Sequence, residues 1–173
     1  MADAGKNLLG LGLGGSVSVA AIAVAMGLTT KWEGTKTVPY QDIVGKWTVC
    51  TGETRVPMRK YTLSECRAFL EKAIRSDFGR GVLQCAPAIQ NSPYQLGVSI
   101  DHAYQFGVKG FCGSTMQKQF QAGDWYQACR AFEAWNKAGG QVVQGIVNRN
   151  VDRMRVCFTN LTPDKTRADR IAL

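Results

Sequence analysis

A run of 24 residues without a charged side chain, residues 7–30, places the strongest constraint on how this chain can fold. A helix of about 20 apolar residues spans the hydrocarbon core of a bilayer, so the run is long enough to cross a membrane. It is a poor anchor, because its strongly apolar side chains contribute at most roughly −5 kcal/mol to insertion. Glycines within the run weaken the helix by about 1 kcal/mol each relative to alanine. We therefore expect a segment that is held weakly in a membrane and is able to leave it and pack against protein. A cleaved secretory signal is the alternative, since Ala-Val-Ala at 23–25 resembles a peptidase site.

The cysteines indicate the compartment of the rest of the chain. Their even number, without a C-x-x-C pair, favours disulfides over a metal or redox site, and His102 is the only histidine. Three disulfides would place the domain in an oxidising compartment, while six reduced, buried cysteines in a cytosolic protein are the alternative. Six cysteines allow 15 pairings, so the residues alone leave the connectivity open. The cysteines are Cys50, Cys66, Cys85, Cys112, Cys129 and Cys157.

The charge balance limits the class of partner. Among 173 residues there are 21 Lys and Arg against 13 Asp and Glu, a formal net charge of +8. This favours an anionic partner: a nucleic acid, an acidic membrane surface or an acidic cell-wall polymer. The basic residues are scattered rather than clustered, which argues against nucleic acid. We expect a monomer that needs no metal or cofactor.

The chain divides into an N-terminal segment, residues 1–30, and one domain, residues 31–173. A β-containing lobe of about 31–60 includes a predicted strand in the sequence KWTVCTGE. From about 62 the periodicity is helical, and Thr62 with Glu65 forms a capping-box pattern that starts a long linking helix. The fold class is therefore α+β, with a larger helical lobe after the small one. Further helices are predicted from Ser92 to Gly107, over about 112–122, from Asp124 to Gly139–Gly140, and over 145–158.

Three polar residues follow the uncharged run: Glu33, Asp42 and Thr48. Glycoside hydrolysis needs a protonated carboxyl on the leaving oxygen and an ionised partner that activates water. Glu33 lies at the expected end of a helix beside Trp32, while Asp42 and Thr48 flank a polar turn around Gly45. A cleft between the two lobes would set these groups opposite each other. Glu, Asp and Thr at such spacing are common, so the trio alone does not identify an enzyme.

The surrounding residues make the pattern specific. Glu33, Asp42 and Thr48 are accompanied by Gly34, Tyr40, Gly45, Val49 and Gly52. This set resembles the catalytic motif of the phage lysozymes of glycoside hydrolase family 24, the T-even phage lysozyme type. The stretch YQFGVKGFCGSTMQKQFQAGDWYQACRAFEAWNKAGG, followed by GIVNRNVDRMRVC, resembles the family's C-terminal lobe, and the likeness covers roughly residues 31–160. Residues 7–30 resemble the signal-anchor-release segment of endolysins from lambdoid and related phages.

The resemblance implies a lysozyme-like fold with the active-site cleft between the lobes. It implies an endolysin that hydrolyses the β-1,4 bond between N-acetylmuramic acid and N-acetylglucosamine in peptidoglycan, tethered to the host inner membrane and then released to the periplasm. Glu33 would be the general acid, with Asp42 and Thr48 holding the water; Tyr104, Gln105 and Ser114 would line the saccharide cleft. The alternative for Tyr104, Gln105 and Ser114 is packing and capping at helix ends. The implied disulfides are Cys50–Cys66, Cys85–Cys112 and Cys129–Cys157.

One departure from the family pattern affects the contact between the lobes. Glu53 replaces a histidine that commonly joins the small lobe to the long helix, and we expect Glu53 to pair with Lys72 or Arg75 instead. Two other functions remain open at this point. A lytic transglycosylase would use the glutamate without Asp42 or Thr48, and a cationic membrane-disrupting protein would need no enzyme activity.

Overall fold

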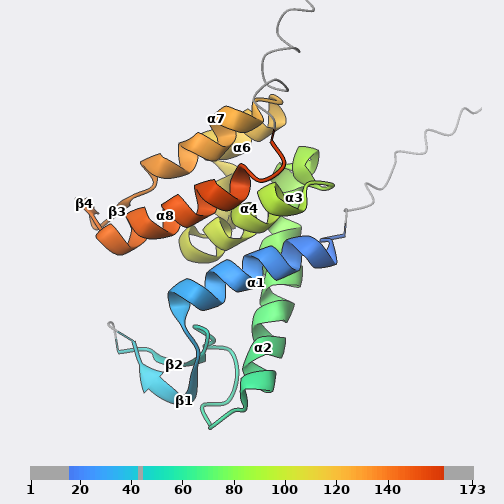
Figure 1. The fold of residues 1–173 in the computed structure, drawn as a ribbon. Helices are drawn as coiled ribbons and strands as arrows, with labels where there is room; N and C mark the ends of the chain where they lie inside the picture. The colour runs from blue at the N-terminus through green and yellow to red at the C-terminus, as the bar shows by residue number, and fades with distance from the viewer. Residues whose placement is uncertain (1–15, 43–44, 162–173) are drawn as a thin grey trace, which may run out of the picture.

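A computed structural model describes residues 16–42 and 45–161. The chain has the predicted α+β architecture, with a small sheet below and a larger helical lobe above (Figure 1). The elements are α1 (Val19–Glu33), β1 (Lys36–Gln41), β2 (Trp47–Cys50), α2 (Leu63–Lys72), η1 (Ala73–Gly79), α3 (Arg80–Cys85), η2 (Pro87–Ile89), α4 (Pro93–Phe106), α5 (Val108–Cys112), α6 (Thr115–Gln121), α7 (Trp125–Arg130), η3 (Ala131–Ala134), β3 (Lys137–Ala138), β4 (Gln141–Val142) and α8 (Gln144–Cys157).

Helix α1 carries the second half of the uncharged run into the domain. It begins after Ser18, whose hydroxyl accepts a hydrogen bond from the Ala21 amide, and ends before Gly34, which adopts φ +68°. The helix therefore runs through position 30, where the sequence places the domain boundary. Within the described part of the chain, no helix is long and apolar enough to cross a membrane. The earlier half of the run, residues 7–15, lies outside the described residues. The α1 side chains in the core are Ala21, Ile22, Ala25, Met26 and Leu28.

Helices α1 and α4 pack closely at Gly97. A Cβ atom at Gly97 would lie 2.5 Å from Cγ1 of Val24 and 3.0 Å from the carbonyl oxygen of Ala21. Any side chain at this position of α4 would therefore push α1 away. Figure 1 shows α1 crossing the middle of the molecule, between the small sheet and the helical lobe.

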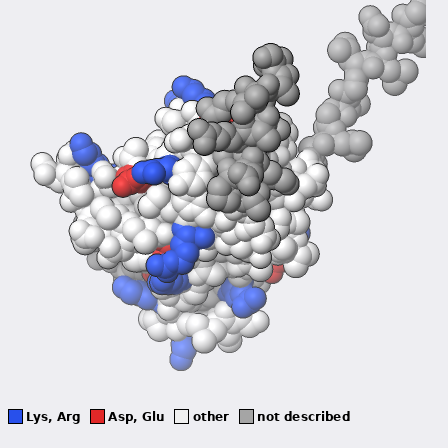
Figure 2. Space-filling model, turned by 45° about the horizontal axis from the view of Figure 1, so that its top comes forward, with Lys and Arg blue, Asp and Glu red and all other residues white. Residues whose placement is uncertain are grey.

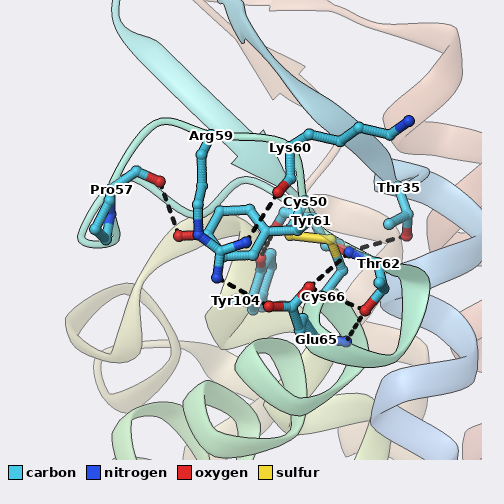
Figure 3. Close-up of a disulfide and its surroundings, with 11 residues drawn as sticks. Thr35, Cys50, Pro57, Arg59, Lys60, Tyr61, Thr62, Glu65, Cys66 and Tyr104 are labelled. Atoms are coloured by element: carbon cyan, nitrogen blue, oxygen red, sulfur yellow. Dashed lines mark hydrogen bonds and ion pairs between the residues drawn. A yellow bond between two sulfur atoms is a disulfide. The ribbon is translucent and has the colours of Figure 1, made fainter.

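The small lobe is an antiparallel pair of strands, and β2 confirms the predicted strand. Tyr40 pairs with Thr48 in the register of the sheet. A disulfide joins Cys50 at the end of β2 to Cys66 on α2, as Figure 3 shows. Thr62 and Glu65 form the predicted capping box at the start of α2.

The helix that links the lobes is continuous from Leu63 to Cys85, because α2, η1 and α3 follow one another without a break. Its middle segment, η1, is π-helical. This continuous helix begins at Leu63, close to the expected start at about 62. The other two disulfides also follow the implied pairing, Cys85 with Cys112 and Cys129 with Cys157.

Two helix predictions for the second lobe need correction. The helix expected over about 112–122 is α6, which begins only at Thr115, because Ser114 caps it; the short helix α5 before it was not predicted. The helix expected to reach Gly139–Gly140 ends earlier, at η3. Both glycines adopt positive φ, +56° and +81°, which suits the tight turn between β3 and β4. Helices α4 and α8 occupy their predicted positions.

Candidate active site

A hollow of about 420 Å³ lies where the end of α1 meets the end of α4 and the start of α8. Glu33, Tyr104 and Gln105, which the sequence predicts to act together, all line it. The other residues around it are Trp32, Val143, Gly145, Ile146 and Arg149. It combines a carboxyl group, a guanidinium group, an amide and aromatic surface, the chemistry that a polar sugar ring requires.

Glu33 is the last residue of α1, and its side chain is 35% exposed. One carboxylate oxygen, Oε1, accepts a hydrogen bond from Nη1 of Arg149 at 2.6 Å. The Arg149 side chain is only 4% exposed, so the contact fixes the carboxyl group against a rigid part of the helical lobe. The carboxyl group is held at the wall of the hollow and still reaches solvent.

Behind this contact lies a buried charge cluster centred on Asp101. Arg149 donates to both Asp101 oxygens, at 2.6 and 3.2 Å, and Arg153 Nε donates to Oδ2 at 2.7 Å. Thr29 of α1 completes the set, since its hydroxyl donates to Asp101 Oδ1 at 2.8 Å. Including Glu33, two guanidinium groups face two carboxylates, and the cluster is electrically balanced.

The cluster determines the ionisation of its central carboxylate. Burial alone would raise the pKa of Asp101, but the charge of Arg153 and the hydrogen bond from Arg149 outweigh it and hold this pKa below its usual value. Asp101 is therefore ionised at neutral pH and keeps both arginines in place. Through Arg149, this buried anion positions Glu33.

A second carboxylate of the helical lobe, Asp152, holds the same end of α1. Lys31 Nζ and Trp32 Nε1 both donate to Asp152 Oδ2, at 2.6 and 3.1 Å. The last turns of α1 are thus bound at residues 29, 31, 32 and 33 to groups on α4 and α8. The position of Glu33 depends on α1 packing as it does here.

Asp42 and Thr48 belong to the small lobe, and both side chains form hydrogen bonds with the backbone of Lys46. The Lys46 amide donates to Asp42 Oδ1 at 2.9 Å, and the Thr48 hydroxyl donates to the Lys46 carbonyl at 3.1 Å. The turn therefore holds the carboxylate and the hydroxyl on either side of one residue. Neither residue lines the hollow that contains Glu33.

Ser114 lies elsewhere. It is buried at the start of α6, where its hydroxyl donates to the Phe111 carbonyl at 2.6 Å and accepts from the Gln117 amide at 3.1 Å. It is not among the residues that line the hollow, and its hydroxyl already caps a helix. Contact between Ser114 and a sugar stays a prediction.

The expected pairing of Glu53 with Lys72 or Arg75 is wrong. Arg55, only two residues away, binds Glu53 at 3.1 Å and also reaches Asp77 of η1 at 2.7 Å. Arg75 instead binds Glu71 one turn earlier, at 3.0 Å. Burial tends to raise the pKa of Glu53, but its hydrogen bonds from Arg55 lower it overall. The small lobe still reaches the long helix, with Arg55 as the bridge.

The sequence analysis missed the charge cluster, although the sequence contains a sign of it. On α8 the buried positions are Ile146, Arg149, Asn150, Arg153 and Cys157. Their spacing follows one face of a helix, so both arginines fall on the face that packs into the core. An arginine on such a face needs a buried anion. Asp101, in the otherwise largely apolar α4, is the available candidate.

Comparisons with known proteins show the family of the chain. Residues 30–153 match the phage lysozyme family, and the chain belongs to that family. The SAR-endolysin of Enterobacteria phage PA-2 is 31% identical over 151 residues, which cover 84% of this chain and 89% of the relative. The SAR-endolysin of Pseudomonas phage phiKMV is 32% identical over 146 residues, 80% of this chain and 89% of the relative.

Solved structures share the fold. The active form of the P1 phage endolysin Lyz superposes with a TM-score of 0.70 at 20% identity, over 86% of this chain and 88% of that one. The muramidase domain of SpmX from Asticaccaulis excentricus superposes with a TM-score of 0.63 at 19% identity, over 86% of this chain and 99% of that one.

Proposed function

We propose that this protein is an endolysin that hydrolyses the β-1,4 bond between N-acetylmuramic acid and N-acetylglucosamine in peptidoglycan. Family membership supports a peptidoglycan hydrolase, and the relatives that share most of the chain's length are SAR-endolysins. The observation that carries the proposal is the Glu33 carboxyl group, which lines a sugar-sized hollow together with Tyr104 and Gln105.

The residues would divide the reaction as follows. Glu33 donates a proton to the leaving glycosidic oxygen. Asp42 accepts a proton from a water molecule that Thr48 helps to orient, and the water attacks the sugar carbon from the opposite face. Such an inverting reaction requires carboxyl groups about 6.5–9.5 Å apart, so that a water molecule fits between them and the sugar. Tyr104 and Gln105 would contact the saccharide from the helical lobe.

We further propose that the described conformation is the form released from the membrane. Before release, residues 7–30 would lie in the host inner membrane and α1 could not bind Asp101, Asp152 and Arg149. After release to the periplasm, α1 packs on α4 and carries Glu33 to the hollow. The basic surface suits an anionic cell wall: Figure 2 shows Lys and Arg side chains spread over one face, with few acidic areas beside them.

The test is the variant Glu33→Gln, assayed on purified peptidoglycan. We expect its rate to fall by about 100-fold or more, because the amide cannot donate the proton. Glu133→Gln is the matched control, since Glu133 is exposed on η3 and makes only a 3.9 Å surface contact with Arg130. Near-ultraviolet circular dichroism checks that both variants fold. Undiminished lysis of permeabilised cells by Glu33→Gln would contradict the proposal and favour membrane disruption.

A further inference from the structure

The contacts that join the two lobes are few. In the described part of the chain, three side-chain hydrogen bonds connect residues 35–60 of the small lobe to the linking helix or to α4. Two of them lie at the exposed surface, from Arg55 to Asp77 and from Arg59 to Glu65. The third is partly buried: the Tyr104 hydroxyl on α4 donates to the backbone carbonyl of Thr51. This buried bond lies beside the hollow that contains Glu33.

The turn that receives the Tyr104 hydroxyl contains Gly52, which adopts φ +79°. Glycine adopts this left-handed conformation without the strain that a side chain would add. A Cβ atom at Gly52 would lie 3.4 Å from the Tyr104 hydroxyl oxygen, an ordinary van der Waals contact. The Tyr104 ring packs against Phe78 of η1 with ring centroids 4.9 Å apart. The ring is therefore supported independently of the hydrogen bond.

Thr51 is also held by two other contacts, one through its neighbour Cys50 and one through its own side chain. It directly follows Cys50, which the disulfide fixes to Cys66 on α2. Its side-chain hydroxyl lies 3.1 Å from that of Thr35. Figure 3 shows Thr35, the disulfide and Tyr104 around this turn.

The position of this contact in the chain matters for catalysis. Thr48 lies on β2, three residues before Thr51 in the turn that follows the strand, and Glu33 lies two residues before Thr35. The bond from Tyr104 thus joins the helical lobe to the small lobe at a point within a few residues of both sides of the proposed reaction centre.

We propose that Tyr104 is a positioning residue, whose hydroxyl holds the small lobe at the distance from Glu33 at which Asp42 and Thr48 can present water to the sugar. This inference rests on the proposed function. It revises the expected role of Tyr104, because Thr51 already occupies the hydroxyl and only the ring is left for the saccharide. Burial, with the nearby charges of Glu33 and Glu53, raises the pKa of Tyr104. The hydroxyl therefore stays protonated at neutral pH and can donate its hydrogen bond.

The test is Tyr104→Phe, which removes only the hydroxyl and retains the ring against Phe78. Tyr126→Phe is the matched control, since Tyr126 is exposed on α7 and packs on Phe158. Spin labels at positions 60 and 137, introduced through a keto amino acid that leaves the six cysteines paired, report the distance between the lobes. Both positions are exposed, one in the small lobe and one on β3.

We expect the lobe-to-lobe distance distribution of Tyr104→Phe to broaden without substrate, while that of Tyr126→Phe matches the unmodified protein. On soluble peptidoglycan fragments we expect kcat to fall about three- to tenfold, because the net free energy of one hydrogen bond corresponds to a factor of this size in an equilibrium constant. KM should change less than kcat. A rise in KM alone, with an unchanged distance distribution, would overturn the proposal in favour of a direct sugar contact. A broadened distribution with unchanged kcat would also overturn it.

The two proposals fail in different ways. The distance measurement needs no activity, and we expect Glu33→Gln to give the distribution of the unmodified protein. Retained hydrolysis by Glu33→Gln would refute the proposed function. An unchanged lobe-to-lobe distance distribution in Tyr104→Phe would refute only the positioning role of Tyr104.

Discussion

Arg149 Nη1 lies 2.6 Å from Glu33 Oε1, although the two residues are 116 positions apart in the chain. Glu33 ends the helix that the uncharged run forms, and Arg149 lies on the last helix of the domain. The same guanidinium group binds the buried carboxylate of Asp101. The position of the proposed acid is therefore set by the core of the helical lobe.

Replacing Arg149 should damage stability and activity together. Arg149→Met leaves Glu33 without its guanidinium partner and Asp101 with one arginine instead of two, and breaking a buried ion pair in this way costs about 3–5 kcal/mol. We expect that loss in the free energy of unfolding, measured by urea with the disulfides intact, and a large loss of hydrolysis. Arg155→Met is the control, because Arg155 is exposed and its contact with Asp152 is 3.4 Å. Equal stability of the two variants would be inconsistent with the described cluster.

The hydrogen bond from Thr29 to Asp101 tests how the helical lobe holds α1. Thr29→Val keeps the shape of the side chain but removes the hydrogen bond to Asp101, which is buried. We expect a loss of about 1–3 kcal/mol, the cost of leaving a buried charged acceptor with fewer partners. Thr30→Val, on the exposed side of the same helix, should change the free energy of unfolding by less than about 0.5 kcal/mol. Thermal unfolding of the two variants under identical conditions provides the comparison.

Two glycines give opposite predictions for the docking of α1. Gly97→Ala places a Cβ atom 2.5 Å from Val24, and we expect a destabilisation of about 1–3 kcal/mol with reduced hydrolysis, because α1 must shift and takes Glu33 with it. Gly27→Ala adds a methyl group on α1 where nothing lies within 4 Å, and should stabilise the helix by up to about 1 kcal/mol. The free energies of unfolding are compared at one pH. A neutral Gly97→Ala would show that α1 and α4 are not in close contact in solution.

His102 predicts a dependence of stability on pH. It is fully buried against Phe106 and Trp135, and burial, with the charges of Arg153 and Arg149, lowers its pKa to about 2. The unfolded chain takes up a proton near pH 6.5 and the folded chain does not, so stability is highest above 6.5 and declines as the pH falls. Between pH 6.5 and 5 the expected loss is about 2 kcal/mol.

The variant His102→Met isolates this effect. Because His102 is the only histidine, the decline between pH 7 and 5 should be largely absent from the variant. The lowered pKa of Asp101 acts in a different range: its contribution is lost only below about pH 4, as the carboxylate becomes protonated. Urea unfolding at several pH values gives the two profiles, and an equal decline in both proteins would contradict the account.

Local signals predicted much of the fold. The capping box at Thr62 and the glycine at 107 mark real helix ends, because their backbone and side-chain chemistry acts within a few residues. The same reasoning placed the start of the next helix at about 112, whereas α6 begins at Thr115 after the Ser114 cap, and it missed the short helix α5. It failed again at Gly139–Gly140, since a glycine pair ends a helix and forms a hairpin turn equally well.

Long-range partners could not be predicted in this way. Glu53 binds Arg55 rather than Lys72 or Arg75, because Arg55 is only two residues away in the same turn. The partners of Asp101 come from α1 and α8. The spacing on α8 places its arginines on a buried face, but no local pattern relates Thr29 of α1 to Asp101. Glu33, Asp42 and Thr48 were selected through the resemblance to a family, and the chemistry of each remains to be tested by substitution.

The configuration of the first product tests the central claim most directly. A water molecule held by Asp42 and Thr48 on the side opposite Glu33 would attack with inversion, so cleavage of the β-1,4 bond should first yield the α-anomer of a reducing N-acetylmuramic acid. Proton NMR of a soluble peptidoglycan fragment, recorded before the anomers equilibrate, with mass spectrometry of the same sample, gives the answer. The account predicts the α-anomer with the mass of one added water. An initial β-anomer, or a 1,6-anhydro product without added water, would contradict it.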